Sequence, residues 1–178
     1  MALISQAKVK AFLKIGDEAT TSIQRGRALE DLVCYIVTKV PGVSTPFRNA
    51  LDAFGAEEID IALSNDQLPS GFRFLPPQLL VECKNHSVPL GSQEVGHFST
   101  VLQNNGCTHG FLFATHGITG DSGLLTAAHH HIADALRDGI RIIVVDRQEI
   151  LALTSGVDLI SLTKMKLCML TAKRTSIG

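Results

Sequence analysis

The chain of 178 residues contains no tryptophan and only four cysteines, none of them in a CxxC pair. The cysteines lie far apart, at Cys34, Cys83, Cys107 and Cys168. This spacing does not suit a structural zinc site, and thiols in apolar segments pack as small hydrophobic residues. Aromatic residues make up only 5% of the chain. This low content argues against a surface that binds single-stranded nucleic acid mainly by base stacking.

Long hydrophobic runs are also missing, since no stretch approaches the ~20 apolar residues that cross a bilayer. The first 14 residues, MALISQAKVKAFLK, carry three lysines and no compact apolar block with a cleavage site. We read this segment as neither a signal peptide nor an anchor, and expect a soluble, cytoplasmic protein with no membrane partner.

Several catalytic motifs are absent. The sequence has no GxxxxGK, HExxH or GxGxxG pattern, so no nucleotide cofactor is expected. Ser122 precedes three histidines at 129–131, but all four lie in one predicted helix, an arrangement unlike a serine-protease triad. The consecutive histidines point in different directions, which makes a shared metal ion improbable.

Charge is distributed unevenly despite a formal net charge of −1. Residues 49–160 carry thirteen acidic and five basic side chains, whereas residues 161–178 carry four basic and no acidic ones. An acidic centre with basic ends suits a site that collects divalent cations beside a region that meets an anion. Ordinary surface variation explains the same counts.

Periodicity predicts an α/β fold with a mixed central sheet flanked by helices. The predicted helices cover residues 17–39, 92–105, about 121–138 with Asp121 or Ser122 as its cap, 147–153 and the tail. The predicted strands cover residues 43–54, 57–63, 78–84, 110–115 and 141–146. We expect one domain over residues 1–178, with a core at about 17–153 and a C-terminal helical extension at 154–178.

Three charged residues stand where the strand pattern favours hydrophobic ones. Asp60 lies inside EEIDIAL, and Glu82 and Lys84 end QLLVECK. Residues i and i+2 of a strand share a face, so Glu82 and Lys84 project together, and Asp60 joins them if the two strands pair. Carboxylates suit Mg²⁺, and a nearby lysine stabilises charge that builds on phosphorus. The plain alternative is a solvated acid and a surface ion pair.

These segments resemble the PD-(D/E)xK nuclease superfamily, and within it the Mrr-like restriction endonucleases and Holliday-junction resolvases. The resemblance covers about residues 22–150 and rests on RGRALEDLV, EEIDIAL, LLVECKN, GSQEVGHF and the αβββαβ order. It implies a restriction-endonuclease-like fold. One departure from the motif is Ile59, which stands where the superfamily's name has proline.

The resemblance also implies roles for individual residues. Asp60 and Glu82 bind the metal, Mg²⁺ with Mn²⁺ as a substitute, and Lys84 is catalytic. Glu30 and Gln93 match further site residues of the family, although each is also an ordinary helix-surface residue. Arg25 and Arg27 are candidates for phosphate contacts that position DNA, or are simply solvated.

We therefore expect a metal-dependent DNA endonuclease of restriction or defence type that acts on double-stranded DNA as a homodimer. Two alternatives remain open, a resolvase of Holliday junctions or other branched DNA, and a non-catalytic DNA-binding subunit. The tail SLTKMKLCMLTAKR is a candidate for the dimer contact or for DNA binding, and loop 64–77 is a candidate source of specificity.

Overall fold

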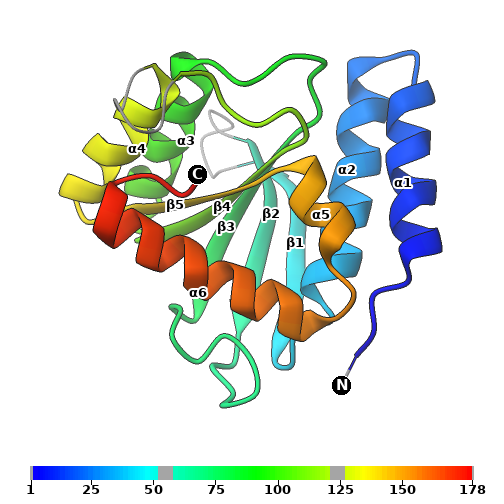
Figure 1. Ribbon diagram of the computed structural model, residues 1–178, viewed down its shortest axis with the longest axis horizontal. Helices are drawn as coiled ribbons and strands as arrows, with labels where there is room; N and C mark the ends of the chain where they lie inside the picture. Colours follow the sequence, from blue (N-terminus) through cyan, green and yellow to red (C-terminus); the bar gives the residue numbers. More distant parts are fainter. Residues whose placement is uncertain (1, 52–57, 121–126, 178) are drawn as a thin grey trace.

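Five strands form one sheet in the order in which they occur in the chain (Figure 1). The computed structural model describes residues 2–51, 58–120 and 127–177. The strands are β1 (Val43–Leu51), β2 (Glu58–Asn65), β3 (Gln78–Lys84), β4 (His109–Ala114) and β5 (Arg141–Val145). β1, β2 and β3 pair antiparallel, whereas β3, β4 and β5 pair parallel. The predicted mixed sheet is thus confirmed.

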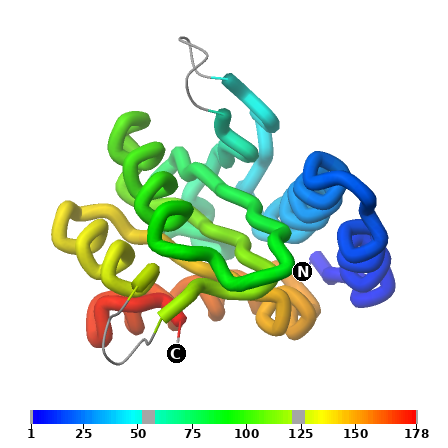
Figure 2. The backbone as a smooth tube through the Cα atoms, turned by 90° about the horizontal axis from the view of Figure 1, so that it is seen from above, coloured from blue at the N-terminus to red at the C-terminus, as the bar shows by residue number. Residues whose placement is uncertain are grey.

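The helices surround this sheet (Figure 2). They are α1 (Gln6–Glu18), α2 (Ser22–Val37), α3 (Ser92–Asn104), α4 (Ala128–Arg137), α5 (Arg147–Ala152) and α6 (Gly156–Lys173). α6 crosses in front of the sheet in Figure 1, with α1 and α2 on one side and α3 and α4 on the other. α3 and α4 each connect two parallel strands, as parallel pairing requires. None of the described helices is long and apolar enough to cross a membrane.

The parallel strands are nearly continuous apolar runs, because helices cover them. Every residue of Phe111–Ala114 and Ile142–Val145 is buried. β5 is an edge strand, and Ser176 near the C-terminus protects it. The Ser176 hydroxyl accepts a hydrogen bond from the backbone N–H of Val144 and donates one to the carbonyl of Ile142. The end of the chain therefore packs as part of the fold.

The prediction of one helix over residues 17–39 was wrong at its start. Two helices occupy this part of the chain, with a break after Glu18. The hydroxyl of Thr21 accepts a hydrogen bond from the N–H of Gln24 and caps α2, a role that threonine favours over helix interiors. α1 was missed, although Ser5 is a capping residue and Val9, Leu13 and Gly16 form its buried face.

Apart from the helix predicted over about 121–138, which the structure describes only as α4 from Ala128 to Arg137, the other predicted elements lie within a few residues of those observed. The proposed cap of the fourth helix, at Asp121 or Ser122, lies outside the described residues. Loop 64–77 joins β2 to the Gln78 end of β3, and its Asn65 side chain donates to the carbonyls of Phe72 and Pro76. Because β3 runs away from this loop to Lys84, loop 64–77 lies at the opposite end of the strand from the predicted site.

Candidate active site

The pairing of β2 with β3 brings Asp60 close to Glu82. Ile61 lies opposite Val81 and Ala62 lies opposite Leu80 in antiparallel register. The paired residues end at Ile61 and Val81, so Asp60 and Glu82 are the next residues of the two strands. The side chain of Asp60 turns to the end of β3, where its Oδ2 accepts a 2.7 Å hydrogen bond from the backbone N–H of Cys83. The two acids therefore converge at the carboxyl end of β3.

Lys84 completes this group. Its Nζ lies 2.6 Å from Oε1 of Glu82, on the strand face that the two residues share. Glu82 is buried, with 7% of its surface exposed, while the Lys84 side chain is 30% exposed. Burial by itself would lower the pKa of Lys84, but the attraction of Glu82 and the hydrogen bond to it raise that pKa above its ordinary value. Lys84 is thus a firmly protonated cation next to two acids.

One cation does not balance the negative charge at Asp60. Burial and the repulsion of Glu82 raise the pKa of Asp60 to about 7, against the opposing effects of the Cys83 N–H and of Lys84. A carboxyl group that titrates so high has a poorly compensated charge, and such groups concentrate at functional sites. An added cation would stabilise the ionised form of Asp60.

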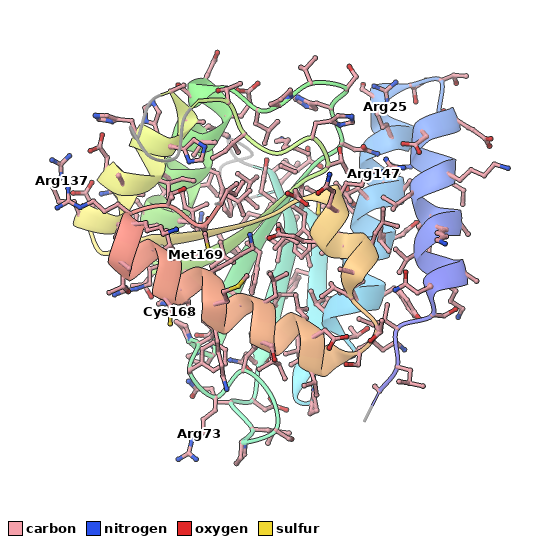
Figure 3. All side chains as sticks on the ribbon, in the orientation of Figure 1. Arg25, Arg73, Arg137, Arg147, Cys168 and Met169 are labelled. Carbon is pink, nitrogen blue, oxygen red and sulfur yellow. The ribbon has the colours of Figure 1, made fainter. Side chains whose placement is uncertain are left out.

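Asp60 and Lys84 line a cavity that has a volume of about 560 Å³, whereas Glu82 is buried and is not among the lining residues. α2 forms the opposite wall with Arg25, Arg27 and Glu30. Arg25 extends from the end of α2 in Figure 3, far from Arg73 at the tip of loop 64–77. The cavity combines acidic and basic side chains at one end of the sheet.

Glu30 is held in place by β1. Its side chain is buried at 6% exposure, and its Oε2 accepts a 2.9 Å hydrogen bond from Nδ2 of Asn49. Nη2 of Arg48 lies 3.6 Å from the same oxygen and 2.7 Å from Asp31. A buried, hydrogen-bonded carboxylate in the cavity wall is no ordinary surface residue of a helix. Glu30 therefore stands where a site residue was predicted.

Gln93 is placed differently. It lies exposed in the first turn of α3 and is not among the residues that line the cavity. The structure thus brings together Asp60, Glu82, Lys84, Glu30, Arg25 and Arg27, and leaves Gln93 apart.

Sequence reasoning missed two asparagines of this cavity. Asn49 adopts a left-handed backbone, with φ of 48°, a conformation that asparagine tolerates better than most residues. Asn85, directly after Lys84, donates from Nδ2 to the carbonyl of Arg25, and its Oδ1 accepts a hydrogen bond from the hydroxyl of Thr115. The available signals were an asparagine inside a weak strand and another where an apolar strand ends.

The carboxylates of Asp60 and Glu82 suit a hard divalent cation that takes few of its ligands from the protein. Among the residues that the structure describes, no three His, Cys, Asp or Glu side chains form a ready metal cluster. Mg²⁺ commonly takes one or two carboxylates and fills its remaining positions with water and phosphate oxygens. The high pKa of Asp60 and the repulsion that it experiences from Glu82 agree with such a partly built site.

Comparison with known proteins identifies a family that matches this chain. A family model described as restriction endonuclease, Mrr_cat, matches residues 25–154, from the first turn of α2 to just beyond α5. No match was found among curated proteins. The matched region contains all five strands, the residues Asp60, Glu82 and Lys84, and every residue that lines the cavity except Ser22 and Ile23. The expected resemblance is confirmed, and the chain belongs to the Mrr_cat family of restriction endonucleases.

Proposed function

We propose that the protein is a metal-dependent endonuclease that hydrolyses phosphodiester bonds of double-stranded DNA, with Mg²⁺ as cofactor and Mn²⁺ as a substitute. The observation that carries the proposal is the convergence of Asp60, Glu82 and Lys84 at the carboxyl end of β3. The family match makes restriction of foreign DNA the favoured role. The family match supports phosphodiester hydrolysis as the reaction, and the cavity holds acidic and basic groups suited to it.

Asp60 and Glu82 are the residues that would hold the cation. When bound, a divalent cation lowers the pKa of a coordinated water and neutralises charge on the phosphate. Glu82 already contacts Lys84 through Oε1, which leaves its Oε2 for this purpose. Asp60 would hold the cation as a carboxylate, and the hydrogen bond from the Cys83 N–H favours that ionised form.

Lys84 would supply positive charge to the phosphate. Its raised pKa keeps Nζ protonated at neutral pH, so it stabilises charge that builds on a phosphate in the cavity. Arg25 and Arg27 line the facing wall and are suited to neighbouring phosphates. Glu30, fixed by Asn49, adds a third carboxylate to the same space. Gln93 remains a predicted contributor from α3.

A homodimer is the proposed assembly, because one active site cuts one strand and a double-strand break requires two. The C-terminal helix α6 offers exposed Met165 for such a contact. Two of its lysines suit DNA binding less well, since Lys166 is buried against Glu149 and Lys164 lies over the ring of Phe74. The packing of α6 on β5 and α2 also supports one domain over residues 1–178.

The test is cleavage of supercoiled plasmid in Mg²⁺ or Mn²⁺. We expect the wild type to nick and linearise the plasmid, Lys84→Ala and Asp60→Ala to lose at least a hundredfold in rate, and exposed Lys173→Ala to match the wild type. Equal cutting by all four proteins would refute the proposed site. A four-way junction assayed in parallel tests the resolvase alternative, and DNA binding without cleavage by the wild type would identify a non-catalytic subunit.

A further inference from the structure

A second, smaller cavity adjoins the active-site cavity. It has a volume of about 170 Å³ and shares Arg25, Asn85 and His86 with the larger one. Its other walls come from α1, through Gly16 and Asp17, and from the segment after β4, through His116. We call it the α1 groove. α1 lies outside the family match, which begins at residue 25, so Gly16 and Asp17 form a wall that the matched region does not include.

The floor of the α1 groove is fixed by Asn85. Its amide bridges the carbonyl of Arg25 and the hydroxyl of Thr115, and so connects α2 to the ends of β3 and β4. α1 approaches this amide closely because residue 16 is a glycine. A Cβ at Gly16 would lie 2.6 Å from Nδ2 of Asn85, a distance that would force the amide to move.

The groove combines one arginine with two exposed histidines. Arg25 makes no ion pair among the described residues, and the imidazoles of His86 and His116 are both exposed. The one acid of the wall, Asp17, accepts two hydrogen bonds from Arg147, of 2.8 and 2.6 Å. That bond is the main cause of its lowered pKa, with smaller contributions from nearby His116 and Arg25. Asp17 is therefore already neutralised by its partner.

We propose that the α1 groove binds a phosphodiester of the substrate strand adjacent to the one that is cut. The inference rests on the proposed function for the identity of the substrate. A volume of about 170 Å³ holds roughly five waters at ~30 Å³ each, so a phosphate oxygen group can enter with part of its hydration. Arginine and imidazole N–H groups donate to such oxygens. The groove then orients the strand that enters the larger cavity.

Replacing Asp17, the acid of the groove, tests whether DNA binding becomes stronger. Asp17→Asn frees Arg147 and adds one positive charge, so the Kd for a fluorescent 30-base-pair duplex in EDTA should fall about threefold to tenfold. The matched control is Asp134→Asn, which frees Arg137 on α4 in the same way. Figure 3 places Arg137 on the other side of the molecule from Arg147. This control should change the Kd less than twofold. Equal effects of both changes would overturn the inference.

Removing a donor gives the complementary test. His116→Ala should weaken binding about fivefold, whereas His130→Ala on α4 should not, with thermal unfolding used to verify that both proteins are folded. Identical Kd values for these two variants would also overturn the inference. Because binding is measured in EDTA, where no cleavage occurs, its outcome is independent of the plasmid assay with Lys84→Ala. The groove and the hydrolytic activity can therefore fail separately.

Discussion

Oδ2 of Asp60 lies 2.7 Å from the backbone nitrogen of Cys83, which places an acid of β2 beside the two charged residues that flank Cys83 on β3. The contact fixes the Asp60 carboxyl group without neutralising it. Its pKa of about 7 results from burial and from Glu82, and Lys84 offsets these only in part. This excess of negative charge makes the cluster of Asp60, Glu82 and Lys84 suitable for binding a cation. Its effect on the pKa of Asp60 can be tested without any substrate.

Replacing Asp60 should make stability less dependent on pH. The pKa of Asp60 is about 7 when folded and 3.8 as a free group, so the folded state binds more protons between these values. The wild type therefore loses stability as pH rises from about 4 to 7, by at most about 1.4 kcal/mol per pH unit. Asp60→Asn should gain most over the wild type at pH 8 and nothing near pH 4, as measured by urea unfolding.

Asp158 provides a control, because its contribution to stability should change with pH in the opposite direction. Hydrogen bonds from Thr154 lower its pKa, so its contribution to stability is present at neutral pH and is lost as pH falls through the acid range. Asp158→Ala should therefore destabilise more at pH 7 than at pH 3. A parallel pH dependence for the Asp60 and Asp158 variants would mean that the Asp60 carboxyl is ionised as easily as an exposed one.

Nuclease activity should depend on the ionisation of Asp60. Below its midpoint, the cleavage rate should rise about tenfold per pH unit, because only the ionised carboxylate can hold a cation. Higher Mg²⁺ concentrations should shift that midpoint to lower pH, since cation and proton compete for the same group. Initial rates between pH 5.5 and 8.5 at several Mg²⁺ concentrations provide the measurement. A midpoint that does not move with Mg²⁺ would assign the titration to another residue.

The Glu82–Lys84 pair should show coupling in stability. Lys84→Gln leaves the buried carboxylate of Glu82 without its counter-ion, a change that should cost about 1–3 kcal/mol because Lys84 is only partly buried. Adding Glu82→Gln should recover part of this loss, since the remaining amides carry no charge. A double-mutant cycle by chemical denaturation measures the coupling. Additive effects of the two changes would show that the 2.6 Å contact contributes little.

Two substitutions of Asn49 should distinguish the effect of backbone strain on stability from the effect of Glu30 positioning on activity. Asn49→Gly relieves the left-handed conformation, whereas Asn49→Ala adds strain of about 1–2 kcal/mol, and both remove the hydrogen bond to Glu30. The glycine variant should thus be the more stable of the two, while both lose activity to a similar extent. If activity instead follows stability across the pair, the amide has no role beyond the fold.

The strands and the acidic cluster were predictable because local signals define them. Gln78–Lys84 is an apolar run between Pro77 and Asn85, and its bounds were predicted without error. The alternation of side chains then placed Glu82 and Lys84 on one face. The break between α1 and α2 was missed because the spacing of apolar residues in α1 continues weakly across the threonines that cap α2. The pattern therefore gives no clear boundary between the two helices.

The cavity walls depend on contacts between distant segments, which no local pattern encodes. Asn49 reaches Glu30 only because β1 packs beside α2, and Asn85 reaches Thr115 only because β3 and β4 end together. The α1 groove depends in the same way on a helix that the periodicity did not reveal. Loop 64–77 was predicted as a source of specificity from its length alone. The direction of β3 places this loop at the end of the strand opposite to Lys84.

The most direct test of the central claim is the location of a bound cation. Crystals soaked with Mn²⁺ should give one anomalous peak between the carboxylates of Asp60 and Glu82, at metal–oxygen distances of about 2.0–2.2 Å, and Asp60→Asn crystals should lack it. A strong peak elsewhere, with none between these two acids in the wild type, would contradict the assignment of the metal site to this cluster.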